Sequence, residues 1–110
     1  MVVEPLRGAL FENFIINEYQ KSIFNQGKNI DLYFWRNNIG NEIDLIVEDG
    51  NNVSYIEIKS SQTFNHSFLK GINYLESISK NIKIKKVVIY GGDIKQLRSD
   101  VSVLPWTEIK

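Results

Sequence analysis

The sequence predicts one α/β domain with a mixed central sheet of four or five strands and flanking helices. The chain has 110 residues, 43% of them hydrophobic, which is enough to bury the core of a single domain. The expected order of elements is helix, three strands, helix, strand. Three consecutive strands with short turns predict an antiparallel meander, and the helix before the fourth strand predicts a parallel crossover.

Two helices are expected from apolar residues that recur at helical spacing. The first runs from about Arg7 to Asn25, and the second from about Ser67 to Ser79. The apolar residues of the first helix are Leu10, Phe11, Phe14, Ile15, Tyr19 and Ile23, and those of the second are Phe68, Ile72, Leu75 and Ile78.

The three consecutive strands are expected at 32–36, 42–48 and 53–59. The second alternates strictly, and this places Ile43, Leu45 and Val47 together on one face. The stretch from 49 to 52, with Asp-Gly-Asn-Asn, is a hairpin turn signal. In the third strand, Ile56 and Ile58 share one face.

Residues 86–90, KVVIY, predict a buried strand that ends at two glycines. A short helix is expected around Ile94 to Leu97. A last strand is expected near Val101 to Leu104.

Composition excludes several classes of function. Thirteen basic residues balance thirteen acidic ones, so bulk electrostatics do not predict a nucleic-acid-binding protein. The chain has no cysteine, which excludes disulfides and thiolate metal sites. It has neither a signal peptide nor an apolar run of about 18 residues, so we expect a soluble cytoplasmic protein with no membrane segment.

Folding the hairpin about its turn pairs Glu48 with Val53, and stepping back places Asp44 opposite Glu57. Like charges directly opposed across strands are destabilising unless a proton, a cation or strong solvation intervenes. Mg²⁺, or Mn²⁺, fits such a pair because these ions take oxygen ligands. Lys59 lies beside Glu57 on the same face, where it can orient a water or offset developing charge.

An ordinary reading of these residues stays open. A Glu-x-Lys pair on a strand is most often an exposed salt-bridged face. Glu42 faces Lys59 in the expected register and can simply pair with it. Glu12 favours a site, because its helical face also carries Ile16, Tyr19 and Ile23, and a carboxylate there is partly desolvated without a partner.

At these residues the sequence resembles the PD-(D/E)XK nuclease superfamily. The matching segments are GALFENFI, GNEIDLIVE and IEIKSS. The resemblance implies a restriction-endonuclease-like αβββαβ core. It also implies that Asp44 and Glu57 are metal ligands, that Lys59 is the catalytic lysine, and that Glu12 holds a metal-bound water or a second metal. The proline of the motif is absent, because Ile43 precedes Asp44.

A closer likeness is to the C-terminal domain of a prokaryotic AAA-type ATPase family, a domain of unknown function. The resemblance implies that an N-terminal P-loop ATPase domain is the partner of this domain. The chain itself contains no phosphate-binding loop motif.

Two functions follow as hypotheses, with residues 1–110 as one domain. The first is Mg²⁺-dependent hydrolysis of DNA, in which the Ile58 carbonyl is a further metal ligand. The second is an inactive module of the ATPase that binds nucleic acid or protein. Lys83 and Lys85, in the lysine-rich run before strand 86–90, and Arg36 are candidate nucleic-acid contacts, although such a lysine run is more often the solvated face that leads into a buried strand. His66, the only histidine, is expected to have a surface or capping role.

Overall fold

The computed structural model describes residues 4–26, 30–78, 83–98 and 100–108. Two α-helices, two 3₁₀ helices and six strands make up these residues. In chain order they are α1 (Glu4–Gln26), β1 (Ile30–Arg36), β2 (Glu42–Asp49), β3 (Asn52–Lys59), η1 (His66–Leu69), α2 (Lys70–Ile78), β4 (Ile84–Tyr90), β5 (Gln96–Leu97), β6 (Ser102–Pro105) and η2 (Trp106–Glu108).

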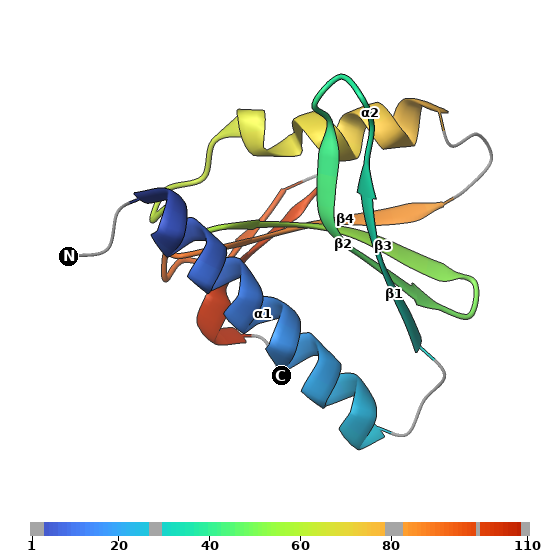
Figure 1. Cartoon of the computed structure of the whole chain (residues 1–110), viewed down its shortest axis with the longest axis horizontal. Helices are drawn as coiled ribbons and strands as arrows, with labels where there is room; N and C mark the ends of the chain where they lie inside the picture. Colours follow the sequence, from blue (N-terminus) through green and yellow to red (C-terminus); the bar gives the residue numbers. More distant parts are fainter. Residues whose placement is uncertain (1–3, 27–29, 79–82, 99, 109–110) are drawn as a thin grey trace.

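The strands form one mixed sheet in the order β1-β2-β3-β4-β6-β5. The first three strands are antiparallel neighbours, whereas β4 lies parallel to β3 and β6 lies parallel to β4. Helix α1 crosses one face of the sheet and α2 covers the other (Figure 1). The predicted mixed α/β sheet with a meander and a crossover is therefore confirmed, with six strands instead of four or five.

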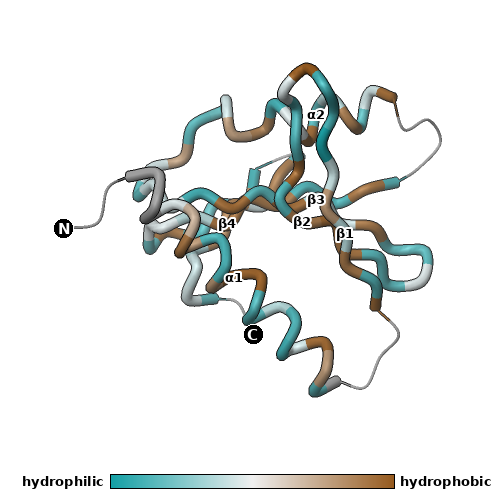
Figure 2. The backbone as a smooth tube through the Cα atoms, viewed as in Figure 1, coloured by the Kyte–Doolittle hydropathy of each residue, from teal (hydrophilic) through white to brown (hydrophobic). Residues whose placement is uncertain are grey.

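Two apolar clusters, one on each face of the sheet, hold the layers together. The cluster under α1 is centred on Ile15, which is fully buried, and the cluster under α2 is centred on Ile72 and Val88. The apolar segments of the central strands gather between the two helices (Figure 2). Strands buried on both faces read as continuous apolar runs, which explains the sequence KVVIY of β4.

The second helical segment is built differently from the expected single α-helix. It begins with the 3₁₀ turn η1, and Asn65 is its N-cap, because the Asn65 Oδ1 accepts a hydrogen bond from the Ser67 amide at 2.8 Å. The α-helical part, α2, starts only at Lys70. Part of the expected helix end and of the lysine-rich run, residues 79–82, lies outside the described residues.

The short helix expected around Ile94 to Leu97 is wrong. Gln96 and Leu97 form strand β5 and pair with Val103 and Ser102 of β6. Backbone pairing with a strand that follows in the chain satisfies these amides, and short-range sequence patterns do not report such pairing.

The faces predicted for β2 are wrong at one residue. Leu45 and Val47 do pack together on the α1 side, but Ile43 joins Ile46 in the cluster under α2. Two residues on the same face of a regular strand are an even number apart, so a spacing of three requires an irregularity between them. The irregularity is a β-bulge, and it lies at the candidate site.

Candidate carboxylate site

The β-bulge in β2 places Asp44. Tyr33 pairs with Ile46 and Trp35 pairs with Ile43, so two steps along β1 match three steps along β2. Asp44 and its neighbour Leu45 therefore lie opposite the single residue Phe34. A β-bulge re-aims side chains and ends regular pairing, and both effects are present here.

Pairing between β2 and β3 ends immediately before Asp44. Glu48 pairs with Val53 as predicted, but the last pair toward the site is Leu45 with Ile56. The predicted cross-strand pair of Asp44 with Glu57 is therefore absent from this ladder. Instead, the Asp44 Oδ2 accepts a hydrogen bond from the Ile58 amide at 2.8 Å in the protein interior, so a side chain replaces the backbone partner.

Glu57 is buried in the sheet and only partly satisfied. Its residue exposure is 3%, and its Oε1 has no hydrogen-bond partner. The Oε2 lies 3.6 Å from the Lys59 Nζ, and the Lys59 side chain is 40% exposed. A buried carboxylate oxygen without a partner is costly, and native structures usually have a specific reason for keeping one.

The electrostatics of the pair oppose full ionisation. Burial, reinforced by the charge of Asp44, raises the pKa of Glu57 to about 9. Burial also raises the pKa of Asp44, although the Ile58 amide and Lys59 partly offset the effect. With a pKa of about 9, caused mainly by burial and then by the charge of Asp44, Glu57 keeps its proton at neutral pH.

Glu12 reaches this site from α1, on the other side of the sheet. Its carboxyl is half-buried, and desolvation followed by the charges of Asp44 and Glu42 raises its pKa, against the effect of Lys59. The structure thus brings the four predicted site residues near one another, because Glu12, Glu57 and Lys59 each interact electrostatically with Asp44.

Glu42 does not take Lys59 away from the site. It lies opposite Arg36 at the end of the β1–β2 ladder, whereas the ion-pair partner of Lys59 is Glu57. The predicted alternative, a simple surface pair of Glu42 with Lys59, is therefore not formed among the described residues. Arg36 is exposed beside the site and remains a candidate contact for a ligand.

The carboxyl oxygens of Asp44 and Glu57 suit a hard divalent cation. The main reason is that the Glu57 Oε1 has no hydrogen-bond partner and lies next to a second carboxylate. The described residues contain no cluster of three or more Asp, Glu, His or Cys side chains arranged as a metal site. Two carboxylates suffice for Mg²⁺, which completes its shell with waters and substrate oxygens. The Ile58 carbonyl stays a predicted further ligand.

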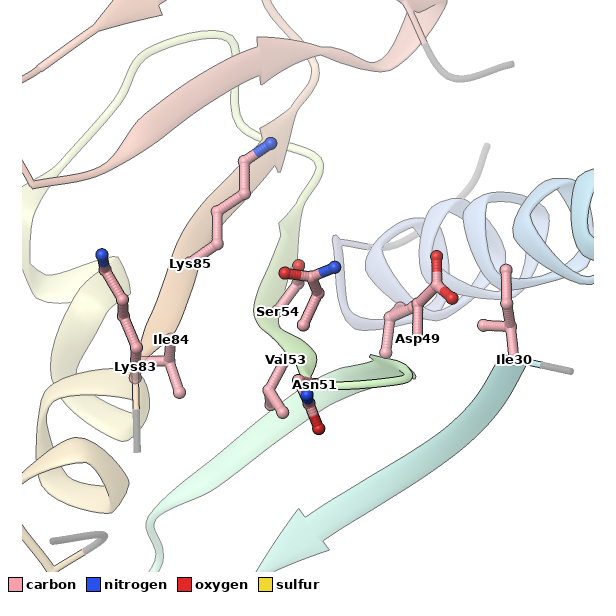
Figure 3. A pocket seen from close by; sticks show the side chains of 10 residues that line it. Ile30, Asp49, Asn51, Val53, Ser54, Lys83, Ile84 and Lys85 are labelled. Atoms are coloured by element: carbon pink, nitrogen blue, oxygen red, sulfur yellow. The ribbon is translucent and has the colours of Figure 1, made fainter. Parts of the chain in front are cut away.

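Lys83 and Lys85 lie far from this site. On β3, Lys85 lies opposite Ser54, which is five residues away from Lys59. At about 3.3 Å per residue, roughly 17 Å of strand separates Lys85 from the level of Lys59. Both lysines line a pocket of about 530 Å³ at the β2–β3 hairpin end of the sheet (Figure 3). The structure does not bring them together with the carboxylates.

Sequence reasoning missed the aromatic surroundings of the site. The Lys59 Nζ lies 5.8 Å from the centre of the Phe68 ring, which comes from η1. Phe68 was predicted only as an apolar core residue of the second helix. No signal in the sequence connects positions nine residues apart in a strand and a 3₁₀ turn.

The fold and the site together define an α/β domain with a buried carboxylate pair at a bulge in its sheet. The sequence profile of DUF4143, a domain of unknown function, matches residues 7–109, and the chain belongs to this family. No curated protein matches the chain. Within the described residues, no helix is both long and apolar enough to cross a membrane.

Proposed function

We propose that this domain hydrolyses phosphodiester bonds of DNA with the help of a divalent cation, Mg²⁺ or Mn²⁺. The observation that carries the proposal is the buried pair Asp44 and Glu57, with an unpartnered Glu57 oxygen and the Lys59 ammonium 3.6 Å from the other oxygen. Asp44 and Glu57 would hold the cation, which would satisfy this oxygen and allow both carboxyls to be ionised together. When bound, the cation supplies Lewis-acid activation of a phosphoryl oxygen.

Three further groups of the chain have roles in the proposed reaction, namely the Ile58 amide, Lys59 and Glu12. The Ile58 amide holds one Asp44 oxygen and leaves the carboxylate oriented toward Glu57. The Lys59 side chain is 40% exposed and its ammonium lies 3.6 Å from the Glu57 Oε2, a place from which it can orient the attacking water and offset charge that develops on the phosphate. Glu12 adds an acid whose raised pKa suits the holding of a proton or a water.

Hydrolysis needs positioned charge more than it needs a large binding surface. The net charge of zero means that the domain lacks bulk attraction for DNA. We therefore propose that cleavage depends on substrate structure or on delivery by a partner, for which an N-terminal P-loop ATPase domain is our candidate. Cytoplasmic location is part of the same proposal.

A second candidate function, a binding or regulatory module of such an ATPase, is favoured by an exposed apolar surface. On α1, Leu10 is 54% and Phe14 46% exposed, and Phe14 contacts Trp106 with ring centres 5.9 Å apart. Adjacent exposed apolar side chains are a common mark of a protein interface. This candidate function requires no chemistry from Lys59.

The first test is a calorimetric titration of the wild type with Mg²⁺ and Mn²⁺, beside the variant Asp44→Asn. Asp93→Asn, which changes an exposed aspartate in the segment after β4, is the matched control. We expect binding in the wild type and the control and its loss in Asp44→Asn. Metal binding that is indifferent to Asp44 contradicts the proposed site.

The second test is cleavage of DNA by the wild type and by Lys59→Ala. We expect Lys59→Ala to keep its fold and its metal affinity and to lose cleavage. The binding module is supported instead if the wild type neither binds metal nor cleaves DNA. It also requires that Leu10→Ser reduces capture of the ATPase domain.

A further inference from the structure

A row of rings and cations leads away from Lys59 along the surface on the α2 side. The Lys59 Nζ lies 5.8 Å from the Phe68 ring centre, and the rings of Phe68 and Phe64 are 5.9 Å apart at 85°. The ring of His66 lies 5.3 Å from that of Phe64. The Arg98 guanidinium carbon lies 4.6 Å from the centre of the Phe64 ring. We call Phe64, His66, Phe68 and Arg98 the aromatic row.

The outer end of the aromatic row is held in place before any ligand arrives. The Arg98 Nη2 donates a hydrogen bond to the Gln96 Oε1 at 2.7 Å, and the Arg98 amide donates to the Val101 carbonyl at 2.9 Å. With Phe64 against the guanidinium, an exposed arginine keeps little of its usual rotamer freedom. A preorganised planar cation costs less entropy when a ligand binds to it.

The chemistry of the row matches unpaired bases joined by phosphates. Aromatic rings and guanidinium planes stack with the bases of a single strand. In a duplex the bases are already stacked on one another and are not available. Lys59 and Arg98 supply a positive charge at each end of the row, where phosphates can bind. Asp100 and Glu76 share a groove with Arg98, and Glu57 and Asp44 lie beside Lys59, so acidic groups at both ends weaken this attraction.

We infer that the aromatic row is a binding site for single-stranded nucleic acid that leads the strand to Lys59. This inference rests on the proposed function, because it assigns the substrate class of the same site. His66 and Arg98 are exposed and can contact bases, and both side chains pack against the half-buried ring of Phe64. Lys59 then meets the phosphate that follows the stacked bases.

Nucleic-acid binding to this row needs no metal, which separates its test from the test of hydrolysis. Anisotropy of a fluorescein-labelled 15-residue oligo-dT is measured in EDTA, beside a 15-base-pair duplex and an abasic oligonucleotide with the same number of phosphates. Arg98→Gln removes the guanidinium plane, and Phe64→Leu removes the aromatic ring against which it packs. Lys21→Gln, at an exposed position of α1, is the charge control, and circular dichroism checks the fold of each variant.

We expect oligo-dT to bind about tenfold more tightly than the abasic strand or the duplex, and Arg98→Gln or Phe64→Leu to remove this difference. Lys21→Gln and Asp44→Asn should keep it. Equal binding of the abasic strand, tighter binding of the duplex, or indifference to Arg98→Gln overturns the inference. If the wild type shows this preference for oligo-dT but neither binds metal nor cleaves DNA, only the proposed hydrolysis is overturned.

Discussion

The buried Glu57 carboxyl makes the stability of this domain fall as the pH rises. Its pKa is about 9 in the folded protein and near 4.5 in the unfolded chain, so between these values the folded state retains a proton that the unfolded state has lost. Stability increases with pH only where the unfolded state binds more protons, and here the native state binds more. The stabilisation is complete below pH 4.5 and is lost as the pH rises through about 9.

The size of the effect follows from the same values. Each pH unit in this interval corresponds to about 1.36 kcal/mol, so Glu57 alone accounts for a loss on the order of 4 kcal/mol between pH 5 and pH 8. The raised pKa values of Asp44 and Glu12 act in the same direction. This loss is a large part of the 5–15 kcal/mol that typically stabilises a domain.

The perturbation that tests this reasoning is Glu57→Gln, which keeps the shape of the side chain and cannot ionise. We expect its free energy of unfolding to change by less than about 2 kcal/mol from pH 5 to pH 8, and to exceed that of the wild type at pH 8. Urea unfolding in EDTA, followed by fluorescence, gives these values. Glu48→Gln, at an exposed position of β2, is the matched control.

Two outcomes refute the reasoning. One is a wild type that is at least as stable at pH 8 as at pH 5. The other is a Glu57→Gln variant with the same pH dependence as the wild type. Either result means that water or a rearrangement solvates the Glu57 carboxylate in the folded protein.

Three further predictions concern the metal and the packing. Millimolar Mg²⁺ at pH 8 should raise the melting temperature of the wild type and leave Glu57→Gln unchanged in thermal unfolding; equal shifts in both proteins place the ion elsewhere. Gly71→Ala should cost at least about 2 kcal/mol in urea unfolding, because its Cβ would lie 2.0 Å from the Glu42 carbonyl oxygen, whereas Gly8→Ala on α1, with open space around it, should be neutral or stabilising. Ile15→Ala should cost about 2–5 kcal/mol because Ile15 is fully buried under the sheet, and a smaller loss means that α1 collapses onto the cavity.

Most of the secondary structure could be read from local patterns. The alternation in β3 and the Asp-Gly turn predicted the hairpin register, and the pair of Glu48 with Val53 confirms it. These features depend on residues close in the chain, where periodicity reports which side chains are buried. Strand β5 escaped prediction because Gln96 and Leu97 are extended only through pairing with β6.

The members of the carboxylate site were predictable, but their geometry was not. Acid and base residues in apolar surroundings marked Asp44, Glu57 and Lys59, since burying a charge is costly without a partner. The predicted cross-strand opposition of the two acids assumed a regular ladder. The bulge replaced it with a hydrogen bond from the Ile58 amide to Asp44.

By itself, the sequence determined the mixed α/β class, the hairpin and the four charged residues of the candidate site, because each leaves a mark in local spacing. Only the tertiary structure decided the bulge at Asp44, the unpartnered oxygen of Glu57 and the row that joins Lys59 to Arg98. These features arise where strands separate and where segments distant in the chain pack together. Their energies depend on contacts that no local pattern of residues encodes.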